Sequence, residues 1–278
     1  MISFIIVNYN TPDLVAQAIS SVYKYLDLQL FEVIVVDNAS IKGSIEVAIA
    51  AFPDVILIKS EENLGFGRAN NLGFQHAQGK YILLLNSDAY LVDTSSILIM
   101  MDYLEKHEHV GIVGPNFIKK DGSPNYAYGN LLEKRKIWSD IGIYKIPIQE
   151  YVNYATYKVC DTKRPKEVGY LAAAGILIKS TVIKELGLFD PHIFLYYEDM
   201  ELGWRYGRHN YLSVILPEAT IVHLGGGSGA SISQELQQKI SDSKSYFIKK
   251  RFGAFFLLKV KWVSFFFKGF KRLKRRIS

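Results

Sequence analysis

A carboxylate placed just after a buried strand is the first chemical feature of this sequence. Asp88 follows the apolar run Tyr81–Leu85, with only Asn86 and Ser87 between them. Proteins commonly hold Mg²⁺ or Mn²⁺ with one or two carboxylates together with phosphate oxygens of a substrate. Asp88 lies too early in the chain to cap the helix that we expect from Ser95. It is therefore a candidate cation ligand.

A second pair of carboxylates lies in an aromatic segment. Glu198 and Asp199 follow Phe194, Tyr196 and Tyr197 at the start of a predicted helix. Aromatic packing removes water from a carboxylate, which raises its pKa and makes it a better base at neutral pH. Acidic residues are also common at helix N-termini because of the helix dipole. Both roles, general base and simple helix-start residue, stay open.

Two glycines at the start of another predicted helix suggest a phosphate site. The segment reads Asn63-Leu64-Gly65-Phe66-Gly67-Arg68 and continues to Asn71. Free N–H groups at a helix start favour phosphate, and Arg68 offers a bidentate contact. The segment matches neither the Walker A loop nor the GxGxxG fingerprint. An ordinary glycine-containing loop before a helix is the alternative.

Asp37 and His223 are two further candidates. Asp37 ends the apolar run from Glu32, where it serves either as a turn residue or as an acceptor for the N3–H of a pyrimidine base. His223 stands just before the segment 225–229 (GGGSG), which is suited to fold over a bound diphosphate. A lone histidine is more often structural, so each signal is weak when taken alone.

These residues must be positioned by an α/β fold. Short apolar runs alternate with amphipathic segments, which predicts a parallel sheet with right-handed crossovers. We expect strands at 3–8, 32–37, 55–59, 81–85, 110–118 and 211–216, and helices from Pro12 and at 45–52, 67–77, 95–107, 180–186 and 199–208. Polar residues follow several of these strands, and open parallel sheets bind ligands at that edge. Residues 124–167 lose periodicity and are rich in tyrosine, which suggests an irregular insertion that shapes an acceptor cleft. Glu201 and Arg205, at i and i+4, fit a surface ion pair.

Composition excludes several classes of protein. The chain has 278 residues, 49% of them hydrophobic, and a single cysteine, which rules out a disulfide framework and a Cys-rich zinc site. Residues 244–278 carry twelve Lys/Arg and no acidic residue, so the remaining 21 basic residues face 27 acidic ones. A mildly acidic body thus carries a basic tail. The N-terminus does not fit a signal peptide, and the apolar stretch 252–267 contains two lysines, so we expect no membrane span and a cytoplasmic body.

Taken as a set, these motifs resemble the family-2 glycosyltransferases of GT-A fold, in particular their bacterial rhamnosyltransferase-like branch. The similarity covers about residues 1–230. It implies an α/β, Rossmann-like, mostly parallel sheet with flanking helices, to which this chain adds a C-terminal helical basic tail. It also implies inverting transfer of a sugar from a nucleotide diphosphate donor, with dTDP-rhamnose favoured and UDP-hexoses as alternatives, to a glycan acceptor in bacterial cell-surface polysaccharide biosynthesis.

The resemblance implies a role for each matching residue. Asp199 matches the general base, and Glu198 orients it or shares its task. Asp88 matches the last acid of the DxD motif and His223 the histidine that completes its site for Mn²⁺ or Mg²⁺; Asn86 replaces the first acid, which leaves one strong ligand fewer. The residues implied in donor binding are Asn8, Asp37, Asn38, Asn63, Gly65, Arg68, Asn71, Ser87 and Asp88.

The C-terminal segment predicts contact with a membrane surface. Phenylalanines at 252, 255, 256, 266, 267 and 270 are expected on one helical face, with basic residues largely on the other. Such a helix lies in the membrane interface, and a lipid-linked acceptor would explain it; packing against the body or a partner chain is the alternative. We therefore expect a catalytic domain at 1–230, with a donor half at 1–118 and an acceptor half at 119–230, and membrane-associating helices at 231–278. The protein would be peripheral on the inner face of the plasma membrane.

Two other functions use similar residues. A nucleotidyltransferase also combines a parallel sheet, carboxylates and a metal, but it needs a glycine-rich, Arg-containing phosphate loop after the first strand, and residues 8–11 (NYNT) lack it. A catalytically degenerate sugar-binding protein would bind nucleotide sugar without turnover, and Asn86 is its best support. Nucleic-acid binding is disfavoured because the body is acidic.

Overall fold

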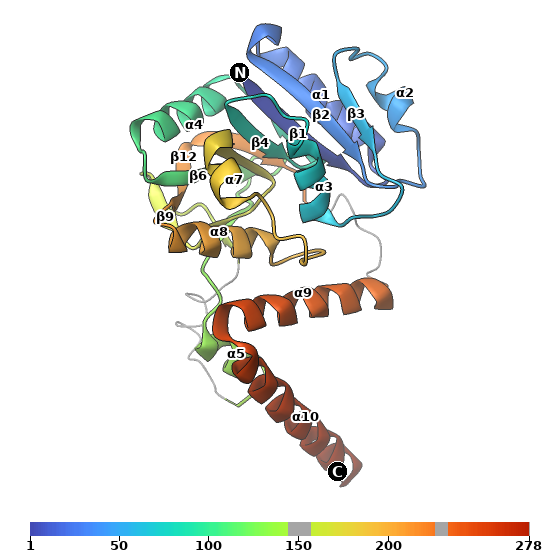
Figure 1. Ribbon diagram of the computed structural model, residues 1–278, viewed down its shortest axis with the longest axis vertical. Coiled ribbons are helices and arrows are strands. Elements are labelled where there is room, and N and C mark those ends of the chain that lie inside the picture. Colours follow the sequence, from blue (N-terminus) through green and yellow to red (C-terminus); the bar gives the residue numbers. More distant parts are fainter. Residues whose placement is uncertain (144–156, 226–232, 278) are drawn as a thin grey trace.

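The centre of the protein is a mixed, mostly parallel β-sheet covered by helices (Figure 1). The computed structural model describes residues 1–143, 157–225 and 233–277. In chain order the elements are β1 (Ile2–Asn8), α1 (Pro12–Tyr25), η1 (Leu28–Leu30), β2 (Phe31–Asp37), α2 (Ile45–Ile49), β3 (Ile56–Lys59), α3 (Phe66–Phe74), β4 (Tyr81–Leu85), β5 (Ala89–Leu91), α4 (Ser95–Lys106), β6 (Val110–Ile118), β7 (Tyr126–Gly129), α5 (Lys134–Asp140), β8 (Lys158–Val159), β9 (Lys166–Val168), β10 (Tyr170–Leu171), β11 (Gly175–Lys179), α7 (Ser180–Leu186), α8 (Glu198–Arg208), β12 (Leu212–His223), α9 (Gln234–Phe252) and α10 (Ala254–Ile277).

The strand order of the main sheet is β3-β2-β1-β4-β11-β6-β12-β5, and β9 also pairs with β12. Strands β3, β2, β1 and β4 are mutually parallel, β11 runs antiparallel to both its neighbours, and β12 is parallel to β6. A smaller sheet has the order β10-β7-β8. The predicted α/β architecture is therefore confirmed.

Strand β2 shows why the central strands read as continuous apolar runs. Val33 and Val35 pack in the same core cluster as the buried face of α1. Ile34 and Val36 point to the other face, where they meet Ala69 of α3. Because helices cover both faces, every position of the strand except Glu32 is buried, and the alternation of a half-exposed strand disappears.

The carboxyl ends of the parallel strands bring their polar residues to one edge. Asn8, the last residue of β1, lies opposite Asp37, the last residue of β2. Residues 60–65 follow β3, and Asn86, Ser87 and Asp88 follow β4, which pairs with β1 on its other side. The expected clustering of these residues along the strands' carboxyl edge is thus found.

Several element boundaries differ from the predictions. The helix expected at 45–52 is the short α2, and the strand expected to end at 216 continues as β12 to His223. The register of β12 against β6 shifts between Leu216 and Thr220, at an irregularity in the pairing. The strand continues beyond this irregularity, past the end of its first apolar run. The irregular insertion contains β7, α5, β8 and β9. Tyrosines 144, 151 and 154 and most of the glycine loop (226–229) lie outside the described residues.

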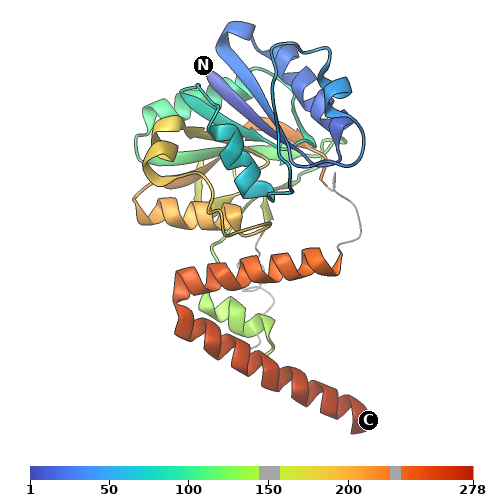
Figure 2. The same cartoon turned by 45° about the vertical axis from the view of Figure 1, so that its right-hand side comes forward.

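The predicted C-terminal helices are present as α9 and α10, which meet at Gly253. Gly253 has a φ of +92°, a left-handed conformation that ends α9, and α10 then projects away from the α/β body (Figures 1 and 2). The single apolar face expected from Phe252 onward is therefore wrong. Phe252 and Phe256 pack inward with Trp138 of α5, whereas Phe255 points to solvent. Within residues 1–143, 157–225 and 233–277, no helix is long and apolar enough to cross a bilayer.

Candidate active site

Asp88 and His223 form a pair at the edge of the sheet. Strand β5 pairs antiparallel with the end of β12, so that Ala89 lies opposite His223 and Asp88 comes next to it. His223 Nε2 is 3.3 Å from Asp88 Oδ1, and the imidazole packs against the Phe117 ring. His223 Nδ1 is buried and has no hydrogen-bond partner within the described part of the chain. Residues 135 positions apart in the sequence thus meet as predicted.

The pair fits a divalent cation. Ligand atoms on neighbouring vertices of an octahedral ion with bonds of about 2.1 Å lie roughly 3 Å apart. The 3.3 Å between Oδ1 and Nε2 is close to this spacing. A donor set of one carboxylate and one imidazole suits Mn²⁺ better than Mg²⁺, which prefers oxygen ligands. Among the described residues no third His, Cys, Asp or Glu joins the pair.

Asn8 and Asp37 belong to a hydrogen-bonded network in the first loop. Asn8 is buried, and its amide donates to Asp37 Oδ1 at 2.8 Å and to Ser40 Oγ at 3.0 Å. Its carbonyl oxygen accepts the Thr11 N–H. Since the protein itself uses both ends of this amide, the geometry favours Asn8 as the residue that orients Asp37. Thr11 Oγ1 in turn donates to Ser87 Oγ at 3.0 Å, which joins the loops after β1 and β4.

Asn38 and Asn63 shape the glycine loop. Asn38 Oδ1 accepts the Leu64 N–H and its amide donates to Asn63 Oδ1, which also accepts the Gly65 N–H. Gly65 has a φ of +78°, and a Cβ there would lie 2.2 Å from the Phe194 carbonyl oxygen. Only glycine fits this position.

Asn71 and Arg68 both lie on α3, but they differ in their partners and in their exposure. Asn71 makes two hydrogen bonds to the backbone of Phe189, one donated at 2.8 Å and one accepted at 2.9 Å, so it fastens α3 to the segment before α8. Arg68 is exposed and contacts Glu62 at 3.4 Å, which leaves its guanidinium accessible from solvent. Of the two, Arg68 is the one with an exposed polar group.

Glu198 and Asp199 open α8, directly after Tyr196 and Tyr197, whose φ values are +59° and +67°. Glu198 is buried, and its Oε2 has no hydrogen-bond partner in the parts of the chain that are described. Asp199 is partly exposed and accepts the Met200 N–H at 2.8 Å. Burial raises the pKa of both carboxyls, and the neighbouring Asp199 raises that of Glu198 further. The predicted desolvation by the aromatic setting is present.

The dyad of Glu198 and Asp199 lies beside the start of α3. A Cβ built on Gly67 would lie 3.8 Å from Glu198 Cβ, and the Phe66 N–H donates to the Phe194 carbonyl at 3.1 Å. The same Cβ would lie 3.0 Å from Phe189 Cβ, so Gly67 permits the close approach of the segment before α8. The residues after β1, β2, β3 and β4 and the carboxyls of α8 therefore gather at one edge of the sheet.

A buried ionic cluster under the dyad was not predicted. The i,i+4 pair of Glu201 and Arg205 exists, but Glu201 is fully buried, so the expected surface location is wrong. Lys250 of α9 is 2.7 Å from Glu201 and 2.5 Å from Asp190. Burial alone would raise the pKa of Asp190, but hydrogen bonds from Lys250 and His192 outweigh it and hold this pKa at about 2. The cluster fixes α9 to the helix that carries the dyad.

We expect Lys250→Met to lower the free energy of unfolding by about 3 kcal/mol, because it removes a shared cationic partner from the buried carboxylates of Asp190 and Glu201. Asp190 has a lowered pKa in the folded state, so its ionic contribution is present near pH 7 and is lost as the pH falls from about 4 through about 2. Thermal unfolding at pH 7 and at about pH 2 measures both effects. Lys249→Met, which removes an exposed lysine of the same helix, is the control. Equal melting temperatures for the two variants at pH 7 would contradict the role of the cluster.

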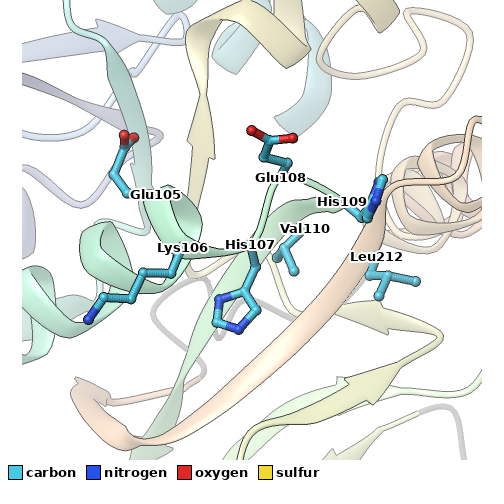
Figure 3. A pocket seen from close by; sticks show the side chains of 7 residues that line it. All are labelled: Glu105, Lys106, His107, Glu108, His109, Val110 and Leu212. Carbon is cyan, nitrogen blue, oxygen red and sulfur yellow. The ribbon is translucent and has the colours of Figure 1, made fainter.

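A cavity elsewhere is not part of this site. A space of about 510 Å³ is lined by Glu105, Lys106, His107, Glu108, His109, Val110 and Leu212 (Figure 3). Val110 and Leu212 begin β6 and β12, so the cavity lies at the opposite end of those strands from His223. The side chains drawn in Figure 3 do not converge. Lys106 forms an ion pair with Asp102, and His107 Nδ1 lies within hydrogen-bond distance of the Tyr103 carbonyl oxygen. The cavity offers no catalytic arrangement.

Comparison with known proteins assigns the family. The model of "Glycosyl transferase family 2" matches residues 3–169. An N-acetylglucosaminyl-diphospho-decaprenol L-rhamnosyltransferase of Mycobacterium tuberculosis (strain H37Rv) is 27% identical over 204 residues, 69% of this chain and 66% of that protein. The dTDP-rhamnosyl transferase RfbF of Shigella flexneri is 25% identical over 231 residues, 82% of this chain and 70% of that protein. This chain thus spans about two thirds of the length of these relatives.

A solved structure shows the same fold. GalNAc-T7, crystallised with UDP, GalNAc and Mn²⁺, superimposes with a TM-score of 0.61 at 19% identity, over 90% of this chain and 50% of that one. The resemblance drawn from the sequence motifs and the predicted GT-A-like sheet are confirmed. With its strand-end polar residues, its Asp88–His223 pair and a family model that matches more than half of its length, the chain belongs to glycosyl transferase family 2.

Proposed function

We propose that this protein is an inverting glycosyltransferase that moves a sugar from a nucleotide diphosphate donor to a hydroxyl group of a lipid-linked glycan, in the assembly of a bacterial cell-surface polysaccharide. One observation carries the proposal: the Asp88–His223 pair and the dyad of Glu198 and Asp199 both lie at the edge where the parallel strands end. Such an edge holds a diphosphate on one side and a general base on the other. The sequences of the rhamnosyltransferase relatives favour dTDP-rhamnose as donor, with UDP-hexoses as the alternative.

The dyad supplies the base. Two neighbouring buried carboxyls resist double ionisation, so one of them keeps its proton at neutral pH. Glu198 is the more deeply buried, whereas Asp199 is accessible. Asp199 is therefore the carboxylate that accepts the proton, and Glu198 holds its place as the neutral partner.

The reaction is a single displacement. The acceptor oxygen forms a bond to the anomeric carbon while the bond from this carbon to the diphosphate oxygen breaks, which inverts the configuration. The acceptor proton passes to Asp199, and the leaving nucleoside diphosphate keeps the electron pair. When bound by Asp88 and His223, Mn²⁺ supplies Lewis-acid stabilisation of the leaving diphosphate. Asp37, Arg68 and the loop around Gly65 hold the nucleotide, with Asn8, Asn38, Asn63, Asn71 and Ser87 keeping these loops in position.

A panel of nucleotide sugars, each with and without Mn²⁺, tests the function. Binding is measured by calorimetry and turnover by release of nucleoside diphosphate, with dTDP-rhamnose expected to be the best donor. A nucleotidyltransferase would instead release pyrophosphate from a nucleoside triphosphate and a sugar 1-phosphate. A degenerate protein would bind a nucleotide sugar and release nothing. Either result would replace the proposal.

The exposed face of α10 supports attachment to an anionic membrane surface. Large apolar side chains there reach solvent, with Phe255 82% and Phe265 74% exposed, and Leu258, Trp262 and Phe266 beside them. Lys259 and Lys261 lie on the same helix, and residues 262–278 add six further Lys/Arg. Aromatic residues enter the headgroup region while basic residues attract anionic lipid. This surface would bring the site to a lipid-linked acceptor and keep the protein peripheral on the cytoplasmic side.

We expect Trp262→Ser combined with Phe265→Ser to weaken binding to vesicles of phosphatidylcholine and phosphatidylglycerol by roughly tenfold or more, because two apolar side chains no longer enter the bilayer. Co-sedimentation at low salt measures the partition, and binding of the wild type should fall as salt increases. Leu28→Ser with Leu30→Ser, which removes two exposed leucines of η1, is the control. Equal partition of both double variants would rule out α10 as the attachment surface.

A further inference from the structure

Two exposed tyrosines stand close together at the start of the smaller sheet. Tyr126 is the first residue of β7 and is 59% exposed, while Tyr157 immediately precedes β8 and is 40% exposed. Their ring centroids are 6.2 Å apart at an interplanar angle of 52°. The buried Tyr170 supports Tyr157 from behind, edge to face at 6.3 Å and 81°. The result is an aromatic surface that the described part of the chain leaves open to solvent; Tyr126 and Tyr157 form this tyrosine platform.

The tyrosine platform is tied to the helix of the general base. Tyr170 packs on Gly203, where a Cβ would lie 2.8 Å from Tyr170 Cβ. Gly203 is one turn along α8 from Asp199, on the same side of the helix. Besides burial, the nearby carboxylate of Asp199 raises the pKa values of Tyr157 and Tyr170. The dyad therefore faces the platform from α8.

The other end of the platform is tied to the candidate cation site. Asn125 donates to the backbone carbonyl of His223 at 2.7 Å, and its side-chain oxygen accepts the Tyr126 N–H at 2.8 Å. Tyr126 is thus held directly beside the strand end that carries His223. The platform thus lies between the strand end that carries His223 and the helix that carries Asp199. In the proposed reaction, the acceptor hydroxyl has to be placed between the leaving diphosphate and the general base.

We propose that the tyrosine platform binds the sugar ring of the acceptor that carries the attacking hydroxyl. This inference rests on the proposed function and adds the recognition element for its second substrate. The C–H face of a pyranose packs on an aromatic ring, and the tyrosine hydroxyl groups stay in water or reach sugar hydroxyls. The nearby carboxyls of α8 disfavour a phosphate group at this place, whereas a neutral sugar suits it.

The test uses free methyl glycosides as probes, so that it does not depend on the identity of the acceptor. Methyl β-D-glucopyranoside, methyl N-acetyl-β-D-glucosaminide and methyl α-L-rhamnopyranoside are examined by saturation-transfer NMR in the presence of UDP or dTDP. For the wild type we expect transfer to the ring C–H protons of at least one glycoside. The signal should fall at least fivefold in Tyr126→Ala with Tyr157→Ala and persist in Tyr126→Phe with Tyr157→Phe, because stacking needs the ring rather than the hydroxyl group.

Three controls keep the outcomes apart. Phe255→Ala removes an exposed aromatic ring from α10, outside the platform, and should leave the signal unchanged. The single variant Tyr126→Ala changes the more exposed of the two tyrosines, and it replaces the double variant in the NMR measurement if the double variant does not fold. Binding of the nucleotide sugars is measured by calorimetry on every variant, because its absence from the wild type contradicts the proposed function. Donor binding by the wild type, together with no glycoside signal or with equal signals from wild type and alanine variants, overturns the platform alone.

Discussion

Asp199→Asn is expected to lower the transfer rate by a factor of about 10² to 10⁴, the range that general bases contribute, and to leave donor affinity unchanged. Asparagine has the shape of aspartate and can still accept the Met200 N–H, so the start of α8 keeps its structure. It cannot accept the proton of the acceptor hydroxyl. Initial rates of nucleoside diphosphate release and calorimetric titration with donor separate the two effects.

The pH dependence provides an independent check on Asp199. Burial raises the pKa of this carboxyl, so the rate of the wild type should rise with pH in a range well above the pKa of about 3.9 of a free aspartate. A carboxyl whose pKa is raised by folding favours the folded state at low pH and opposes it as the pH rises. Asp199→Asn should therefore melt at a higher temperature than the wild type at pH 8, with the gain disappearing toward pH 4. Asp102→Asn, at an exposed ion pair of α4, is the matched control. A fully active Asp199→Asn protein would assign the base elsewhere.

Asp88→Asn is expected to have the second large effect. It removes the carboxylate from the candidate cation site and leaves only the imidazole of His223. Loss of several kcal/mol of stabilisation of the leaving group corresponds to a rate decrease on the order of a thousandfold. Apart from activity, binding of Mn²⁺ in the presence of UDP or dTDP, followed by electron paramagnetic resonance, should weaken at least tenfold.

A substitution at Asn86 tests the same candidate cation site by adding a carboxylate. Asn86→Asp restores the acid that stands at this position of the DxD motif, which the family resemblance identifies. A second carboxylate should tighten Mn²⁺ binding by roughly tenfold, because affinity rises with the negative charge of the ligand set. The same resonance titration measures it. Unchanged binding of Mn²⁺ by both variants would mean that Asp88 and His223 hold no cation.

The sheet and its functional edge could be predicted because the signal is local. Buried parallel strands such as β1, β2 and β4 are continuous apolar runs, and the polar residues that end them point directly to the edge where ligands bind. The proximity of Asp88 to His223 was predicted from the order of the family's motifs and not from a local sequence pattern. It depends on β5, a strand of three residues that is too short to show any periodicity.

The residues that were missed or misplaced are those whose partners lie far away in the sequence. Glu201 looked like half of a surface pair because Arg205 is four residues away, whereas its burial depends on Lys250 of α9. The pairing of Tyr126 with Tyr157 depends on the short antiparallel contact between β7 and β8 within a segment without periodicity. The stretch from Phe252 looked like one helix because a single glycine in a helical pattern does not reveal its backbone angle. Gly253 takes a positive φ that the amphipathic pattern did not indicate.

The break at Gly253 also fixes the rotational phase of the last helix. The ion pairs of Lys250 hold α9 to the catalytic body, and α10 starts one residue after the break. Each residue turns an α-helix by about 100°, so one residue inserted or deleted at this joint would swing Phe255 and Phe265 a quarter turn or more around the axis. The length of the connection is thus as strictly constrained as its composition, and homologues that share the same mode of attachment should tolerate substitutions at this joint more readily than changes in length.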